Sequence, residues 1–243
     1  MPLHPLPSSY AIMFFIGSGA LLYQAVDFAL RQGHAVDGAC CPPQDGSGKR
    51  LERRGVSVSW SENPSVSLPP LLAGITDGVV FSINNAHLLS DALLRSGPRF
   101  FNIHNGLVQR YRGLAEVCIV AALCRGETRY GATLHELLPQ QKVDAGPVLA
   151  QLDAPIGPED GFAEVLRQSL VTCQRLFELQ LAEILAGRAE AHPVPLEGQA
   201  LNYRNLPAVL QACEDPARLA RAVRLGPYAG FFPRLHEALS AAC

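Results

Sequence analysis

The sequence predicts an α/β fold in which a mostly parallel sheet is flanked by helices and followed by a small C-terminal module. Over the first half of the chain, short apolar runs alternate with amphipathic segments. This alternation is typical of a parallel sheet built from successive strand–helix–strand units. The chain has 243 residues, which suits a main domain with an appendage. We therefore expect the main domain over residues 1–190 and the small module over residues 191–243.

Composition narrows the class of protein further. Hydrophobic residues make up 48% and charged residues 17% of the chain, as in ordinary folded proteins. With 20 Lys and Arg against 22 Asp and Glu, the net charge of -2 gives no reason to expect nucleic acid or an anionic membrane as a partner. The early apolar run at 11–16 is too short for a membrane span, and no Lys or Arg precedes it as in a signal peptide.

The seven cysteines are odd in number and form no CxxC pair. Most of them have apolar neighbours, which favours free thiols in a protein core. We expect a reducing, cytoplasmic location. The usual ligand spacings of zinc are missing, so no metal site is expected.

The first elements are predicted as a strand at 10–16, a helix at 20–32, and a strand at 35–41 that carries Cys40 and Cys41 on opposite faces. The turn Gly17-Ser18-Gly19 joins the first strand to the helix. It is either a plain tight turn or a site for an anion or a substrate phosphate. Because Leu22 stands where GxGxxG requires its third glycine, we do not predict NAD.

The remaining elements follow from turn residues and periodicity. A helix at 49–54 and an extended segment at 56–60, with Trp60 in the core, lead into an irregular stretch at 64–72. After these we expect a strand at 78–83, a helical segment at 86–95, a strand at 99–104, a helix at 115–123, paired or edge strands at 130–138 and 148–156, a long helix at 160–186, a linker at 189–198, and short helices at 207–212 and 216–224.

A candidate site forms where the strand at 99–104 ends. Asn102 and His104 are two residues apart and therefore share one face of that strand. Asp144 lies in the loop between the two later strands, which allows it to approach His104. An amide that stabilises an oxyanion, an imidazole that moves a proton and a carboxylate that orients it suit acyl-type transfer.

Simpler interpretations stay open for several of these residues. His104 taken alone is as readily a structural histidine, and His135 lies in the middle of its predicted strand, where packing is the simpler role. Lys142 and Asp144 could form a loop ion pair, which contributes little when exposed. The segment 110–112, Arg-Tyr-Arg, is either a solvated turn or a site for an anionic part of a substrate.

The order of these motifs resembles the N10-formyltetrahydrofolate-dependent formyltransferases. The matching positions are Asn102, His104, Tyr111, Arg112, Gly113, Gly126, Glu127, Gly131, Thr133, Asp144 and Gly146. The likeness is greatest to formyltransferases acting on amino sugars and to formylation domains of peptide-antibiotic and siderophore assembly lines. It spans about residues 10–190.

This resemblance implies a Rossmann-like sheet and a cytoplasmic enzyme of natural product biosynthesis that transfers a formyl group from N10-formyltetrahydrofolate. The acceptor would be an amine of a small metabolite, free or bound to a carrier protein, and a homodimer would be compatible. Asn102, His104 and Asp144 would be catalytic, and no metal would be needed. The residues implied to border the pterin are Ile83, Leu88, Leu89, Gln141, Lys142 and Val143. A formyl-folate hydrolase and a non-catalytic binding module that keeps the fold are the alternatives.

The chain departs from the family pattern at three places. Val108 and Gln109 replace the usual leucine and proline, and Glu116 replaces a common proline. The spacing from Thr133 to Asp144, 144 − 133 = 11 positions, is longer than usual. The extra length falls beside the expected pterin site.

Overall fold

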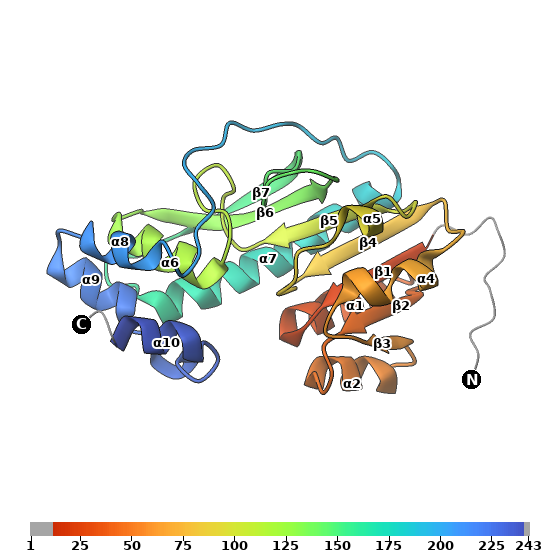
Figure 1. Ribbon diagram of the computed structural model, residues 1–243, viewed down its shortest axis with the longest axis horizontal. Coiled ribbons are helices and arrows are strands. Elements are labelled where there is room, and N and C mark those ends of the chain that lie inside the picture. Colours follow the sequence, from red (N-terminus) through yellow and green to blue (C-terminus); the bar gives the residue numbers. More distant parts are fainter. Residues whose placement is uncertain (1–11, 241–243) are drawn as a thin grey trace.

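The structure is a computed structural model that describes residues 12–240. A twisted sheet occupies the centre, and a group of short helices near the C-terminus lies at one end of the elongated molecule (Figure 1). The strands are β1 Ile12–Gly17, β2 Gly38–Cys41, β3 Val58–Trp60, β4 Gly78–Ile83, β5 Arg99–His104, β6 Arg129–Leu137 and β7 Val148–Pro155. The helices are α1 Gly19–Arg31, α2 Gly46–Arg53, α3 Pro64–Ser67, α4 Pro69–Leu72, α5 Asp91–Leu94, α6 Ala115–Cys124, α7 Phe162–Leu185, α8 Leu206–Gln211, α9 Pro216–Val223, α10 Pro233–Ser240 and the 3-10 turn η1 Gly226–Tyr228.

The seven strands form one sheet in the order β3-β2-β1-β4-β5-β6-β7. Strands β1 to β5 are parallel to their neighbours, whereas β6 runs antiparallel to β5 and β7 antiparallel to β6. This arrangement confirms the predicted mostly parallel α/β sheet. It also brings the loops that follow β1, β4 and β5 to one edge of the sheet, where ligands of open α/β folds bind.

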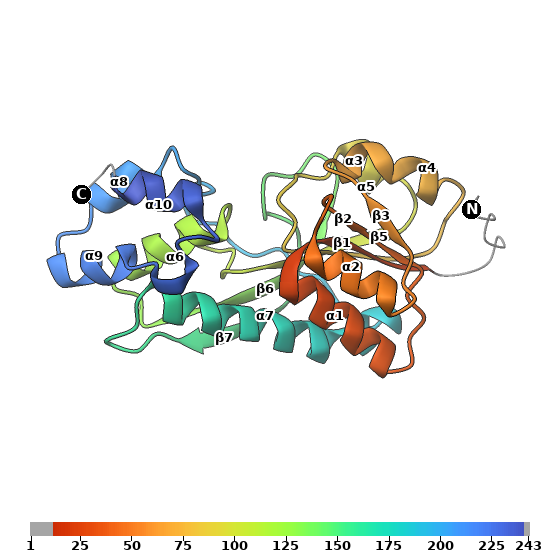
Figure 2. The same ribbon diagram turned by 90° about the horizontal axis from the view of Figure 1, so that it is seen from below.

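Helices cover both faces of the sheet, which explains why its central strands are apolar throughout. Helices α1 and α7 lie on one face and α3, α4 and α5 on the other (Figure 2). The Phe177 ring of α7 packs against Phe81 of β4 with ring centroids 5.2 Å apart. Cys41 and Cys40 belong to the cores on the two opposite faces, as their adjacent positions in a strand predict.

Three expectations differ from the structure, and a fourth cannot be compared with it. Residues 64–72 form α3 and α4, because Asn63 caps the Ser65 N–H at 3.1 Å and a proline begins each helix. The predicted helix at 86–95 shrinks to α5, since the Asn85 side chain binds the backbone of His87 and holds residues 84–90 as a loop. Trp60 is 36% exposed rather than in the core, and its indole N–H donates to Glu52. The expected start of β1 at residue 10 lies outside the described residues.

The C-terminal helices pack against α6 and the beginning of α7. Leu206, Ala222 and Leu235 from this module share one apolar cluster with Val120 and Phe162. The chain reaches the module through a linker that leaves the far end of α7 and runs back over the long strands (Figure 1). The boundary at residue 190 stays a prediction. No helix between residues 12 and 240 is both long and apolar enough to cross a membrane.

Candidate functional site

The site begins where β5 meets β6. Antiparallel register places His104 opposite Thr133 and Asn102 opposite His135. The side-chain nitrogen Nδ2 of Asn102 lies 3.1 Å from Nε2 of His135. The other ring nitrogen of His135, Nδ1, is 3.3 Å from the Glu136 carbonyl oxygen, to which it can donate. This pairing orients the amide at the tip of β5.

Asp144 reaches the same point from the loop between β6 and β7. Its Oδ2 atom accepts the Gly113 N–H at 2.8 Å and lies 3.4 Å from Nδ1 of His104. Its Oδ1 atom lies 3.5 Å from Nε2 of His135. The backbone of Asp144 has φ +49°, a left-handed conformation that aspartate tolerates better than most residues. The structure therefore brings Asn102, His104 and Asp144 together, with His135 between the amide and the carboxylate.

The charge of Asp144 is fixed by this environment. Burial on its own would raise the pKa of this carboxyl. The charge of His104, the hydrogen bond and charge of His135, and the Gly113 N–H outweigh burial and hold the pKa of Asp144 well below its usual range. Asp144 is thus an anion at neutral pH, and its two carboxylate oxygens face the two imidazoles.

The other nitrogen of His104 is also occupied. Nε2 lies 2.6 Å from the carbonyl oxygen of Tyr111 and donates to it. Gly106 makes room for this contact, because a Cβ atom there would lie 2.9 Å from Nε2 and 2.7 Å from the Tyr111 oxygen. A ligand that uses Nε2 must therefore displace the Tyr111 carbonyl, and Gly106 permits the movement.

His135 is the residue that sequence reasoning missed. Its side chain is fully buried, and it contacts both Asn102 and Asp144. The sequence favoured a packing role for His135; the residue is buried, as that role requires, and it also contacts two residues of the candidate site. The signal was present in the sequence, since His135 follows Thr133 with the spacing that joins Asn102 to His104 and so shares one face of β6 with Thr133.

The residues expected beside the pterin lie in two neighbouring segments. Gln140 donates its backbone N–H to Asp91 at 2.9 Å and so connects the loop before Asp144 to the segment after β4. Ile83 is buried at the end of β4, Leu88 is 75% exposed, and Leu89 is half-buried. On the second segment Gln141 and Lys142 are exposed and Val143 is half-buried. Their part in binding a pterin stays a prediction.

The linker before α8 holds the segment that contacts His104 and Asp144. Glu197 donates its N–H to the Gln109 carbonyl at 2.6 Å, and Leu201 donates to the Arg112 carbonyl at 2.7 Å. The buried guanidinium of Arg112 donates to the Gly198 carbonyl at 2.5 Å. Segment 111–113 is thus supported by the linker on one side while it contacts His104 and Asp144 on the other.

Gly113 offers a test of this support. Its φ is +102°, and a Cβ atom there would collide with the Leu201 carbonyl oxygen. We expect Gly113→Ala to lower the free energy of unfolding by at least about 2 kcal/mol in urea titrations, because a strained backbone and a steric clash add. The control is Gly187→Ala, where φ is +67° but no atom lies within 4 Å. Equal losses in the two variants would contradict the role of the linker contact.

In the glycine turn after β1, a backbone N–H group that could bind an anion already donates to a carboxylate of the protein. Gly19 donates its N–H to Asp45 Oδ1 at 3.2 Å, and Gly48 donates to Asp45 Oδ2 at 2.7 Å. The Ser18 hydroxyl donates to the Asn84 carbonyl at 3.0 Å. Of the two interpretations, the structure favours a tight turn, since Asp45 supplies the negative charge that an anion would bring.

The positions that depart from the family pattern have partners of their own. Gln109 and Gln151 exchange two side-chain hydrogen bonds of 2.7 and 2.8 Å. Val108 is buried and donates its N–H to Thr133 at 3.3 Å. Glu116 accepts the Tyr203 hydroxyl at 2.8 Å and so ties α6 to the C-terminal module.

The described residues offer neither a cluster of metal ligands nor a disulfide. Across residues 12–240 the structure contains no group of three or more His, Cys, Asp or Glu side chains that could hold a metal ion. The six cysteines of the described region are free thiols, and Cys243 lies outside it.

Comparison with known proteins gives a family and several structures of the same fold. Residues 78–174 match the family model described as formyl transferase. A sugar 3-N-formyltransferase named WlaRD, solved in the presence of dTDP and 5-N-formyl-THF, superposes with a TM-score of 0.65 at 15% identity, covering 75% of this chain and 66% of that one.

A sugar N-formyltransferase from a Shewanella species superposes with a TM-score of 0.68 at 17% identity and covers 88% of both chains. Glycinamide ribonucleotide transformylase 1 from Symbiobacterium toebii gives 0.66 at 21% identity, covering 81% of this chain and 99% of that one. At these identities the likeness establishes a shared fold. This chain spans about two thirds of the length of WlaRD.

Fold and site together define an α/β protein with an amide, two imidazoles and a carboxylate at the end of its central strands. The match to the family model covers all four of these groups, since it extends over β4, α5, β5, α6, β6, β7 and part of α7. This part of the chain, residues 78–174, is similar to the formyl transferase family.

Proposed function

We propose that the protein transfers the formyl group of N10-formyltetrahydrofolate to an amine of a small metabolite. The observation that carries the proposal is the convergence of Asp144 on His104 and His135, with Asn102 beside His135. The match of residues 78–174 to the formyl transferase family model supports formyl transfer as the reaction type. A structure of the same fold was solved with 5-N-formyl-THF, which supports a formylated folate as the donor.

In this reaction a neutral amine attacks the formyl carbonyl. An N–H of Asn102 and the protonated imidazole of His104 stabilise the oxyanion of the tetrahedral intermediate. Asp144 orients His104. The protonated imidazole gives its proton to the departing N10 nitrogen, and the nitrogen of the attacking amine then returns a proton to the imidazole, so that the charged His104 is regenerated. His135 positions Asn102 and does not touch the reacting atoms.

The donor would lie against the two segments that Gln140 and Asp91 join. Ile83, Leu88 and Leu89 would face the pterin from one segment, and Gln141, Lys142 and Val143 from the other. Exposed side chains at Leu88 and Lys142 leave that side open to a ligand. Entry of the formyl group would displace the Tyr111 carbonyl from His104.

The acceptor is proposed as a primary amine or hydroxylamine of an intermediate in natural product biosynthesis, either free or tethered to a carrier protein. The structures of the same fold include sugar N-formyltransferases, which supports a sugar amine among the candidates. A cytoplasmic location and a homodimer belong to the same proposal. Gel filtration with light scattering tests the dimer.

Binding and product formation test the proposal separately. We expect folinic acid, a stable folate analogue, to bind with 1:1 stoichiometry in isothermal titration. With N10-formyltetrahydrofolate and a panel of amino sugars and hydroxylamines, mass spectrometry should detect a product heavier by one carbonyl. Release of formate in the absence of any amine would instead indicate a formyl-folate hydrolase. If folinic acid does not bind, the remaining alternative is a non-catalytic binding module.

A further inference from the structure

A second concave site lies away from the triad, between the segment after His104 and the C-terminal module. The cavity has a volume of about 540 Å³, within the range of small-molecule sites. Its walls come from three places in the sequence. They are formed by Arg110, Cys124, Arg125, the linker residues Glu197, Gly198, Gln199 and Leu201, and Asn205, Ala208, Val209 and Ala212 around helix α8.

The lining of this cavity combines charged and apolar side chains. Arg110 and Arg125 supply two positive charges, and Glu197 supplies one negative charge. None of the ion pairs within residues 12–240 includes Arg125, whose guanidinium lies 5.5 Å from the ring centroid of Tyr111. Ala208, Val209 and Ala212 give an apolar wall on α8.

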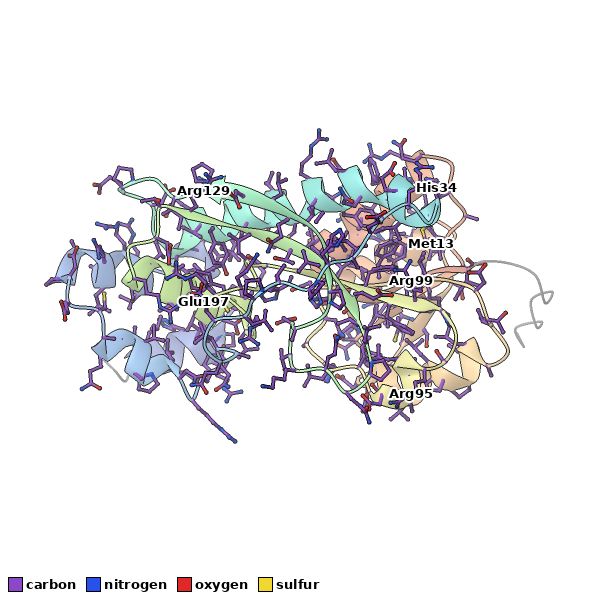
Figure 3. The ribbon with its side chains drawn as sticks, turned by 90° about the horizontal axis from the view of Figure 1, so that it is seen from above. Met13, His34, Arg95, Arg99, Arg129 and Glu197 are labelled. Carbon is purple, nitrogen blue, oxygen red and sulfur yellow. The ribbon has the colours of Figure 1, made fainter. Side chains whose placement is uncertain are left out.

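Arg110 can bind an anion without losing the shorter of its two ion pairs. It pairs with Glu127 at 2.6 Å and, more loosely, with Glu197 at 3.4 Å. The Glu197 side chain is 69% exposed and can turn into solvent. Figure 3 labels Glu197 over the C-terminal half of the molecule. An anion placed between Arg110 and Arg125 would replace the contact between Arg110 and Glu197. It would also contact the guanidinium of Arg125, which has no carboxylate partner among the described residues.

We propose that this cavity binds a small organic anion, a carboxylate or phosphate attached to a compact apolar body. The anionic group would lie between Arg110 and Arg125, with Gln199 and Asn205 offering amide hydrogen bonds, and the apolar body would lie on α8. The occupant is distinct from the folate, because none of the six residues expected beside the pterin lines the cavity.

An occupant would touch the part of the chain that supports the catalytic groups. Glu197 and Leu201 hydrogen-bond the backbone of Gln109 and Arg112, on either side of the Tyr111 carbonyl that occupies His104. A bound anion is therefore placed to change the rate of the proposed formyl transfer. Binding of the anion itself does not require that this transfer takes place.

The test uses phenyl phosphate as the probe, because it joins one phosphate to one small apolar ring. We expect isothermal titration of the full-length protein to show one site that weakens as salt is raised. Benzyl alcohol, which lacks the charge, should not bind detectably. Arg125→Ala should weaken binding of phenyl phosphate about tenfold or more, and Ala208→Trp should abolish it by filling the apolar end.

The matched control is Arg129→Ala, which removes an exposed arginine paired with Asp153. Figure 3 labels Arg129 near the upper edge of the molecule, away from Glu197. Equal weakening by Arg125→Ala and Arg129→Ala, or unchanged affinity in Ala208→Trp, would overturn the proposal. So would displacement of phenyl phosphate by saturating folinic acid, which would assign the site to the folate. A protein that binds the probe but transfers no formyl group would refute the proposed function alone.

Discussion

Replacing His104 with alanine should lower kcat/KM for formyl transfer by about 10³-fold, because the variant loses the group that both stabilises the oxyanion and moves the proton. The imidazole is 6% exposed, contacts Asp144 through Nδ1 and donates to the Tyr111 carbonyl through Nε2. Loss of the imidazole removes both of these contacts at once. Single-turnover measurements with N10-formyltetrahydrofolate and an active amine would report the chemical step.

Because His104 is buried, its loss could also weaken the fold, so a second variant is needed. His104→Gln keeps an N–H donor for the Tyr111 carbonyl but cannot carry a proton at neutral pH, and we expect the same loss of turnover with a smaller change in unfolding free energy. His236→Ala, an exposed histidine of α10, serves as the control and should leave activity unchanged. Full activity in the glutamine variant would exclude proton transfer by this residue.

The strands that deliver the site could be predicted closely from the sequence. β4 and β5 have the predicted bounds, because each is a short apolar run between residues that interrupt regular structure. The antiparallel pair β6 and β7 was expected on both sides of Asp144 and lies there. Helix α10 was not predicted, although Pro233 stands where prolines commonly begin a helix and Leu235 and Leu239 have helical spacing.

The contacts of the candidate site were less accessible. The meeting of Asn102, His104 and Asp144 followed from strand spacing and loop position, but the role of His135 depends on the register of β5 against β6. Register depends on the packing of whole strands and not on local residues. The support of segment 111–113 by residues 197–201 is a main-chain contact across more than 80 positions, and no side-chain pattern encodes it.

Asp144→Asn should reduce turnover about as strongly as the changes at His104 and should alter how stability depends on pH. The amide keeps the size of the carboxyl but removes the negative charge that His104 and His135 face. A neutral partner cannot stabilise the imidazolium, so we expect a loss of about 10²- to 10⁴-fold in kcat/KM. Folinic acid binding should change much less, because the contacts proposed for the pterin lie elsewhere.

The sign of the pH effect follows from the pKa of Asp144, which the folded protein holds below its usual range despite burial. An unfolded aspartate has a pKa of about 3.9, so the stabilising contribution of the carboxylate is complete above about pH 5 and is lost as the pH falls through 3.9 towards the folded value. The free energy of unfolding of the natural protein should therefore exceed that of Asp144→Asn by a large amount at pH 7, and this difference should shrink below about pH 4.

Urea unfolding across this pH range measures the difference. Asp153→Asn is the control, since Asp153 is exposed and pairs with Arg129 at the surface. A stability difference that stays constant down to about pH 3 would mean that Asp144 is not held as an anion by its two histidines.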